Sequence, residues 1–174
     1  MKHIIRFSQV AALFAASFAH LACGLSPSLG AQERTTAEQR DVVESIERLF
    51  TAMARRDTVA ARAVMAPGSR FYSIIVGSPS AALRQQTDSA FLASLAVGTE
   101  RLLERIWTPT VLVRGPVASV WAPYDFHVNG AFSHCGVDSF TLVRVGGDWK
   151  VTGITYTVER SGCAPSPLGP PKAP

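Results

Sequence analysis

The segment from residue 121 to residue 140, WAPYDFHVNGAFSHCGVDSF, concentrates the side chains that could perform acid–base chemistry. It holds Asp125, His127, His134 and Asp138, and the chain's other two histidines lie within its first twenty residues. A carboxylate that binds an imidazole fixes its tautomer and raises its basicity, as a general base requires. These residue types therefore indicate a site for proton transfer, with Asp125 and His134 as the candidate catalytic pair.

The turn inside this segment predicts how those side chains are arranged. Asn129-Gly130 between two alternating apolar runs is typical of a two-residue type I′ hairpin. The register that follows pairs Val128 with Ala131 and places Asp125 opposite His134. Because side chains alternate between the faces of a strand, one face is expected to carry the whole set. The pocket residues predicted from this register are Trp121, His127, Phe132, Asp138 and Phe140.

Two other interpretations of the same residues remain open. An Asp125–His134 pair could simply hold the hairpin register. A cross-strand pair of this kind stabilises a sheet by about 0.2–1 kcal/mol. The four side chains could also hold zinc or iron, since imidazole and carboxylate suit both metals. None of the helix-borne ligand spacings is present, so this remains a minor alternative, and neither a metal nor a cofactor is expected.

The cysteines favour a structural role. Cys23 falls in the N-terminal leader, which leaves Cys135 and Cys163 as a single pair. Neighbouring strand residues point to opposite faces, so His134 is badly placed to activate Cys135 as a nucleophile. We therefore predict a Cys135–Cys163 disulfide, formed in an oxidising compartment.

Residues 1–31 have the pattern of a signal peptide. Lys2 and Arg6 precede an apolar, alanine-rich stretch at residues 7–22, and small residues then allow cleavage after Ala31. The sequence HLAC ending at Cys23 resembles a lipobox, so lipidation of Cys23 is the alternative, and only then would the protein contact a membrane. Either pattern predicts export to the periplasm or the extracellular space.

Charge and composition exclude some partners. Loss of Lys2 and Arg6 with the leader would roughly halve the formal net charge of +4. The arginines are scattered, and no basic face with interleaved aromatic residues is visible, so nucleic acid is not an expected partner. Residues 164–174 are proline-rich and are expected to form a disordered tail. One domain is left, at residues 36–163.

The domain begins with helices and continues with strands. Thr36 and Gln39 form a capping-box pattern that opens an amphipathic helix ending near Arg56. The segments expected after it are a helix at 59–65, a strand at 70–76, a loop at 77–86, a helix at 87–96 and four long strands at 102–113 (bent at Pro109), 117–128, 131–145 and 149–160. This order predicts an α+β fold in which helices cover one face of an antiparallel sheet.

These elements and three sequence stretches resemble the nuclear transport factor 2-like superfamily, with its SnoaL-like and ketosteroid-isomerase-like branches. The stretches are the opening helix, ASVWAPYDF at 118–126 and LVRVGGDWKVTGITYTV at 142–158. The resemblance implies a curved antiparallel sheet that forms a cone-shaped α+β barrel around N-terminal helices. Tyr-Asp-Phe at 124–126, Ser-His-Cys-Gly at 133–136 and Gly-Cys at 162–163 are similar to exported bacterial members whose function is unknown.

The resemblance implies a pocket for a small apolar or aromatic ligand, between the first helix and one sheet face. Because the ketosteroid-isomerase branch uses a tyrosine and acidic residues there, Tyr72 and Asp125 are positional candidates. One alternative is an enzyme of this fold, an isomerase, dehydratase or hydrolase, that uses the Asp–His pair. The other is a dimeric structural or partner-binding module, its homodimer formed through the opposite sheet face, with Ala122, Tyr124, Phe126, Val137, Ile154 and Tyr156.

Overall fold

The computed structural model describes residues 36–77 and 83–171, and these fall within one compact unit. The expected signal peptide, its cleavage after Ala31 and the lipidation of Cys23 all concern residues outside the described ones. Within those ranges, no helix is both long enough and apolar enough to cross a membrane.

The first helix, α1 (Ala37–Arg55), begins and ends as its sequence predicts. Thr36 accepts a hydrogen bond from the Gln39 backbone at 3.1 Å, and the Gln39 side chain accepts one from the Thr36 backbone at 2.7 Å. This capping box satisfies N–H groups that the first helical turn leaves unpaired. Arg56 ends the helix in a left-handed conformation with φ of 54°.

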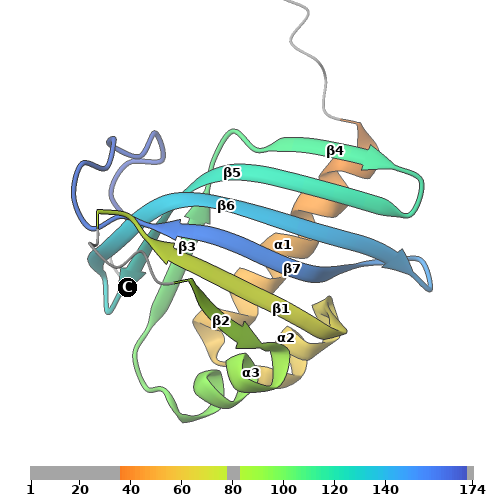
Figure 1. The fold of residues 1–174 in the computed structure, drawn as a ribbon, viewed down its shortest axis with the longest axis horizontal. Coiled ribbons are helices and arrows are strands. Elements are labelled where there is room, and N and C mark those ends of the chain that lie inside the picture. The colour runs from red at the N-terminus through yellow and green to blue at the C-terminus, as the bar shows by residue number, and fades with distance from the viewer. Residues whose placement is uncertain (1–35, 78–82, 172–174) are drawn as a thin grey trace, which may run out of the picture. The chain divides into compact units, whose positions relative to one another are not determined.

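Two short helices follow. α2 (Thr58–Val64) is capped by Asp57, whose carboxylate accepts from the Val59 and Ala60 backbones. α3 (Asp88–Val97) is capped by the Thr87 hydroxyl. Both helices lie beside the β1 end of the sheet in Figure 1.

Seven strands form one curled, unclosed sheet (Figure 1). They are β1 (Met65–Ile75), β2 (Arg84–Thr87), β3 (Leu102–Ile106), β4 (Thr110–Arg114), β5 (Val117–Val128), β6 (Ala131–Val145) and β7 (Asp148–Val158). The order is β2-β1-β7-β6-β5-β3, and β4 also pairs with β5. Every pairing is antiparallel except that of β1 with β7. The α+β class is confirmed.

Some strand boundaries differ from the prediction. The strand expected at 102–113 is two strands, because Thr108 has a φ of 41° and Pro109 cannot donate to a ladder. The loop expected at 77–86 contains the start of β2, which pairs with β1 from Arg84. β1 itself begins at Met65, earlier than expected, with a register shift before Arg70.

The β5–β6 hairpin has the predicted turn but not the predicted register. Asn129 and Gly130 have φ values of 53° and 82°, as a type I′ turn requires, and Val128 pairs with Ala131. His127 still pairs with Phe132, but the next pair is Phe126 with His134. Ser133 is therefore an extra residue, a β-bulge, and every later residue of β6 is displaced by one position.

This displacement places the predicted β6 residues on the same face as Ala122 and Tyr124 of β5, and not on that of Asp125 and His127. The face expected to be free for dimer formation is the one against which α1 packs, and its Ala122 and Tyr124 are 0% and 2% exposed. The proposed dimer surface is therefore wrong as stated, since most of it is interior. The core contains Val42, Ile46, Leu49 and Phe50 of α1 and, from the sheet, Val120, Phe140, Leu142 and Val151.

The predicted disulfide is confirmed. Cys135 and Cys163 are bonded, with their Cα atoms 6.1 Å apart. The chain beyond Cys163 differs from the expected disordered tail, because the structure describes it as far as Pro171. The Gly169 carbonyl accepts a hydrogen bond from Arg105 Nη1 at 3.0 Å, and this segment covers part of the outer sheet face.

Candidate functional site

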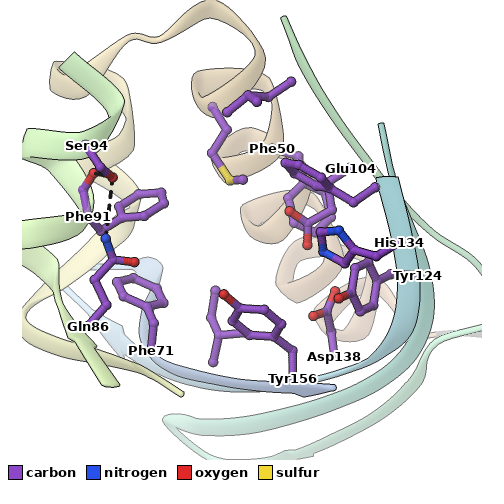
Figure 2. A pocket seen from close by; sticks show the side chains of 14 residues that line it. Phe50, Phe71, Gln86, Phe91, Ser94, Glu104, Tyr124, His134, Asp138 and Tyr156 are labelled. Atoms are coloured by element: carbon purple, nitrogen blue, oxygen red, sulfur yellow. Dashed lines mark hydrogen bonds between the residues drawn. The ribbon is translucent and has the colours of Figure 1, made fainter. Parts of the chain in front are cut away.

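A cavity of about 280 Å³ lies between the inner face of the sheet and the helices (Figure 2). Its walls are mostly apolar and aromatic, with a few polar groups. α1, α3 and every strand except β4 contribute side chains. The lining residues are Phe50, Met53, Phe71, Gln86, Phe91, Ser94, Leu102, Glu104, Tyr124, Phe126, His134, Asp138, Ile154 and Tyr156. Such a hollow, with few convergent polar groups, is typical of a small-molecule site.

Two carboxyl groups meet at one wall of the cavity. Glu104 of β3 and Asp138 of β6 lie close enough to shift each other's pKa, although β5 lies between their strands. Burial raises the pKa of Glu104 to about 7. Burial, and then the neighbouring charge of Glu104, raise the pKa of Asp138 well above its usual range. The pair therefore loses its first proton near neutral pH, from Glu104, while Asp138 keeps its own.

Asp138 has unused hydrogen-bonding capacity. Its side chain is 1% exposed, and its Oδ2 atom has no hydrogen-bond partner among the described residues. Figure 2 shows the carboxyl group directed into the cavity. A buried polar atom without a partner is rare, because it loses hydration and gains nothing in return. Asp138 Oδ2 is thus available to a bound molecule.

Aromatic rings hold the region around the acid pair. Tyr124 lies opposite Gly136, and its hydroxyl donates to the Thr157 carbonyl at 2.7 Å. A Cβ on Gly136 would collide with that same carbonyl oxygen. The His134 ring packs at 5.0 Å on Phe126, and burial, followed by the charge of Arg160, lowers the pKa of His134. His134 is therefore mainly neutral at pH 7.

The opposite wall is formed by β1, β2 and α3. Phe71 and Phe91 pack with ring centres 4.9 Å apart. Beside them, Gln86 Nε2 donates to Ser94 Oγ at 3.4 Å (Figure 2). Tyr156 lies between the two walls, and its pKa is raised, mainly by burial.

The predicted Asp125–His134 pair does not form. Asp125 pairs with Cys135 across the ladder, and it projects from the outer face, whereas His134 lines the inner cavity. The physical reason is the bulge at Ser133, because a shift of one residue moves a side chain to the other face. The predicted site is thereby divided between the two sides of the sheet.

Asp125 instead belongs to a buried ion pair. Arg105 Nε and Nη2 donate to its two carboxylate oxygens at 2.8 and 2.5 Å, and His127 Nε2 lies 3.5 Å away. Burial raises the pKa of Asp125, but the hydrogen bonds and charge of Arg105 outweigh it, and the net pKa is lowered. A bidentate pair that is 15% and 6% exposed is a typical structural contact.

The other predicted site residues are divided in the same way. Of the expected pocket residues, Asp138 lines the cavity and Phe140 lies in the adjoining core, 6.0 Å from the Phe50 ring. His127, Trp121, Phe132 and Tyr72 belong to the outer face, with Trp121 58% exposed. Asp125, His127, His134 and Asp138 therefore do not surround one point and do not form the suggested metal site.

Glu104 is the site residue that sequence reasoning missed. It stands between Leu102 and Ile106 in β3, where alternation places all three on one face. The sequence could have indicated Glu104 as a site residue, because it is a single carboxylate on a strand face that is otherwise apolar. Its partner Asp138 lies in a distant part of the sequence, and only the sheet order brings the two together.

Comparisons with known proteins support the fold. No family model matches the chain, and no curated protein matches it. Among solved structures, a protein from Cytophaga hutchinsonii is 18% identical, with a TM-score of 0.57, over 69% of this chain and 98% of that one. A protein of unknown function from Shewanella baltica is 16% identical, with a TM-score of 0.55, over 71% and 95%.

A third solved structure, from Streptomyces avermitilis, is described as a candidate dehydratase. It is 16% identical, with a TM-score of 0.55, over 70% of this chain and 95% of that one. All three proteins are described as nuclear transport factor 2-like. Together with the curled sheet around α1, these likenesses show that the chain has the fold of the nuclear transport factor 2-like superfamily.

Proposed function

We propose that this chain is an exported protein that binds a small, largely apolar molecule in its inner cavity. One observation carries the proposal: the buried Asp138 Oδ2 atom faces an apolar cavity and has no partner within the described part of the chain. A ligand that supplies a hydrogen bond there would remove the cost of that unpaired atom. The Cys135–Cys163 disulfide and the pattern of residues 1–31 support export.

Native mass spectrometry of the purified protein tests this proposal. The wild-type protein should retain a small molecule that Ile154→Trp removes, because an indole at this position would fill the cavity. Thr155→Trp is the matched control, since Thr155 is the next residue of β7 and is exposed. An adduct of equal mass and abundance in both variants would place the ligand elsewhere and contradict the proposal.

A second candidate function is proton transfer on the bound molecule. It is favoured by the acid pair, in which Glu104 has a pKa of about 7 and Asp138 keeps its proton. Two neighbouring carboxyl groups with separated pKa values can serve as base and acid. Here Glu104 would remove a proton from carbon while Asp138 donates a hydrogen bond.

Isotope exchange separates catalysis from simple binding. If Glu104 is a base, a retained ligand incubated in D₂O should gain deuterium at an acidic carbon, and Glu104→Gln should abolish this gain without releasing the ligand. Equal exchange in the wild-type protein and the variant would eliminate the catalytic role of Glu104.

A further inference from the structure

We propose that the inner cavity selects an apolar amine, bound as its ammonium ion beside Glu104 and Asp138. This inference rests on the proposed function, because it requires that the cavity be a binding site. It adds the charge and the chemical class of the ligand.

The first argument is the charge of the lining. Glu104 and Asp138 are the acidic groups there, and no lysine or arginine is among the described residues that line the cavity. His134 is the remaining basic group, and burial keeps it mainly neutral at pH 7. A carboxylate ligand would meet the ionised acid pair without a counter-charge, so like-charge repulsion disfavours it.

The second argument is hydrogen bonding. An ammonium group has three N–H donors and no acceptor. The wall offers acceptors that suit it, namely the Glu104 carboxylate and the unpaired Oδ2 atom of Asp138. Hydrogen bonds between ionised partners are about twice as strong as neutral ones.

The third argument is the aromatic lining of the cavity. Six rings line it, those of Phe50, Phe71, Phe91, Tyr124, Phe126 and Tyr156. The negative face of a ring attracts a cation that lies within about 6 Å of it, by about 2 kcal/mol when the cation is desolvated. The same rings accommodate the apolar part of the amine. A cavity of about 280 Å³ has room for a compound with one ring.

The charged groups near this wall define the expected pH dependence. Tyr124 and Tyr156 stay neutral, since the pKa of each is raised. The more distant cations are Arg160, which acts on His134, and Arg84, which acts on Tyr156. α1 and α3 contribute no charged side chain to the described lining. Binding of a cation should therefore strengthen as Glu104 loses its proton, by up to tenfold per pH unit below about pH 7.

The experiment compares three probes with similar skeletons: 2-phenylethylamine, 2-phenylethanol and 3-phenylpropionate. Isothermal titration of the wild-type protein at pH 8 should give the amine an affinity roughly tenfold or more above that of the alcohol. The carboxylate should bind most weakly. At pH 5.5 the preference for the amine should largely disappear, because Glu104 is then protonated.

Glu104→Gln isolates the contribution of the acid pair. It should reduce amine affinity to that of the alcohol and remove most of the change between pH 6 and pH 8. Alcohol binding by the same variant verifies its fold. Asp41→Asn on the exposed surface of α1 also removes one negative charge and should change nothing.

The possible results separate the amine selectivity from the proposed binding function on which it rests. If the alcohol or the carboxylate binds the wild-type protein as tightly as the amine at pH 8, the amine inference is overturned and the apolar binding site stands. If none of the three probes binds saturably, both proposals fail. An amine preference that persists in Glu104→Gln would also overturn the inference.

Discussion

Glu104 and Asp138 act on each other's pKa across β5, at the wall of a cavity that is otherwise mainly aromatic. Their strands are not neighbours in the sheet, and the residue paired with Asp138 on the intervening strand is the small Ala122. The contact therefore depends on the curled sheet rather than on one hairpin. It provides the inner face with a group that can bind, accept or donate a proton.

The acid pair predicts a specific pH dependence of stability. The pKa of Glu104 is about 7 in the folded protein and 4.5 as its ordinary value. The folded state therefore holds more protons between these values, and the free energy of unfolding should fall as the pH rises from about 4.5 to 7. This loss should amount to roughly 1–3 kcal/mol.

Glu104→Gln tests this dependence, because the amide has a similar shape and no charge. Urea unfolding at pH 5 and pH 8 should show a smaller loss of stability in the variant than in the wild-type protein. Identical losses in the two proteins would mean that Glu104 does not have a raised pKa.

Asp125→Asn should lower stability without changing ligand affinity. It leaves the guanidinium of Arg105, which is 15% exposed, without its counter-charge, and the cost of breaking such a pair is about 3 kcal/mol. Asp148→Asn, at a side chain that is 69% exposed, is the control and should cost little. A loss of ligand affinity in Asp125→Asn with unchanged stability would restore Asp125 as a site residue.

The Asp125–Arg105 pair also predicts sensitivity to acid. The pKa of Asp125 is below its ordinary value of 3.8, so its contribution to stability is present above that pH and is lost as the pH falls further. The wild-type protein should lose this stability below about pH 4, and Asp125→Asn should lose less over the same range. Parallel acid-unfolding curves measured by circular dichroism would count against this assignment.

Removal of the disulfide should destabilise the fold and release the C-terminal segment. Cys135 and Cys163 are 28 residues apart, and closing a loop of that length contributes roughly 3–4 kcal/mol. A Cys135→Ser/Cys163→Ser variant should show that loss in urea unfolding. It should also show faster amide exchange at residues 164–171, and unchanged exchange there would show that Arg105 alone holds the segment.

Gly136→Ala should disturb the tyrosine beside the acid pair. The added Cβ would overlap the Thr157 carbonyl, which accepts the Tyr124 hydroxyl, and overpacking of this kind costs about 1–3 kcal/mol. Gly153→Ala is the milder comparison, because its Cβ would lie 3.2 Å from the Thr141 hydroxyl and 3.3 Å from the Arg70 carbonyl oxygen, against 2.3 Å from the Thr157 carbonyl oxygen at Gly136. Equal unfolding free energies for the two variants would argue against a special role of Gly136.

The sequence predicted the features that short-range chemistry determines. The Thr36 capping box, the Asn129-Gly130 turn and the long β5 and β6 strands depend on neighbouring residues, and all are confirmed. The single cysteine pair outside residues 1–31 was sufficient to predict the disulfide.

The site could not be predicted in the same way. One extra residue at Ser133 separated the predicted residues of β6 from those of β5, which lie on the other face, and no residue type there signals a bulge. Glu104 and Asp138 meet only because β3, β5 and β6 are adjacent in a curled sheet. Long-range pairing of this kind depends on the whole fold. The error at Ser133 then propagated, because period-two alternation transfers one wrong register to every later side chain.

The central claim, that the inner cavity is the binding site, is tested most directly by NMR titration with 2-phenylethanol. In the wild-type protein and in Thr155→Trp, saturable shifts should concentrate on the backbone amides of Phe71, Phe91 and Tyr156. In Ile154→Trp, whose indole fills the cavity, these shifts should be absent while the spectrum remains that of a folded protein. Shifts that concentrate on the outer face near His127 and Phe132, or that persist in Ile154→Trp, would contradict the account.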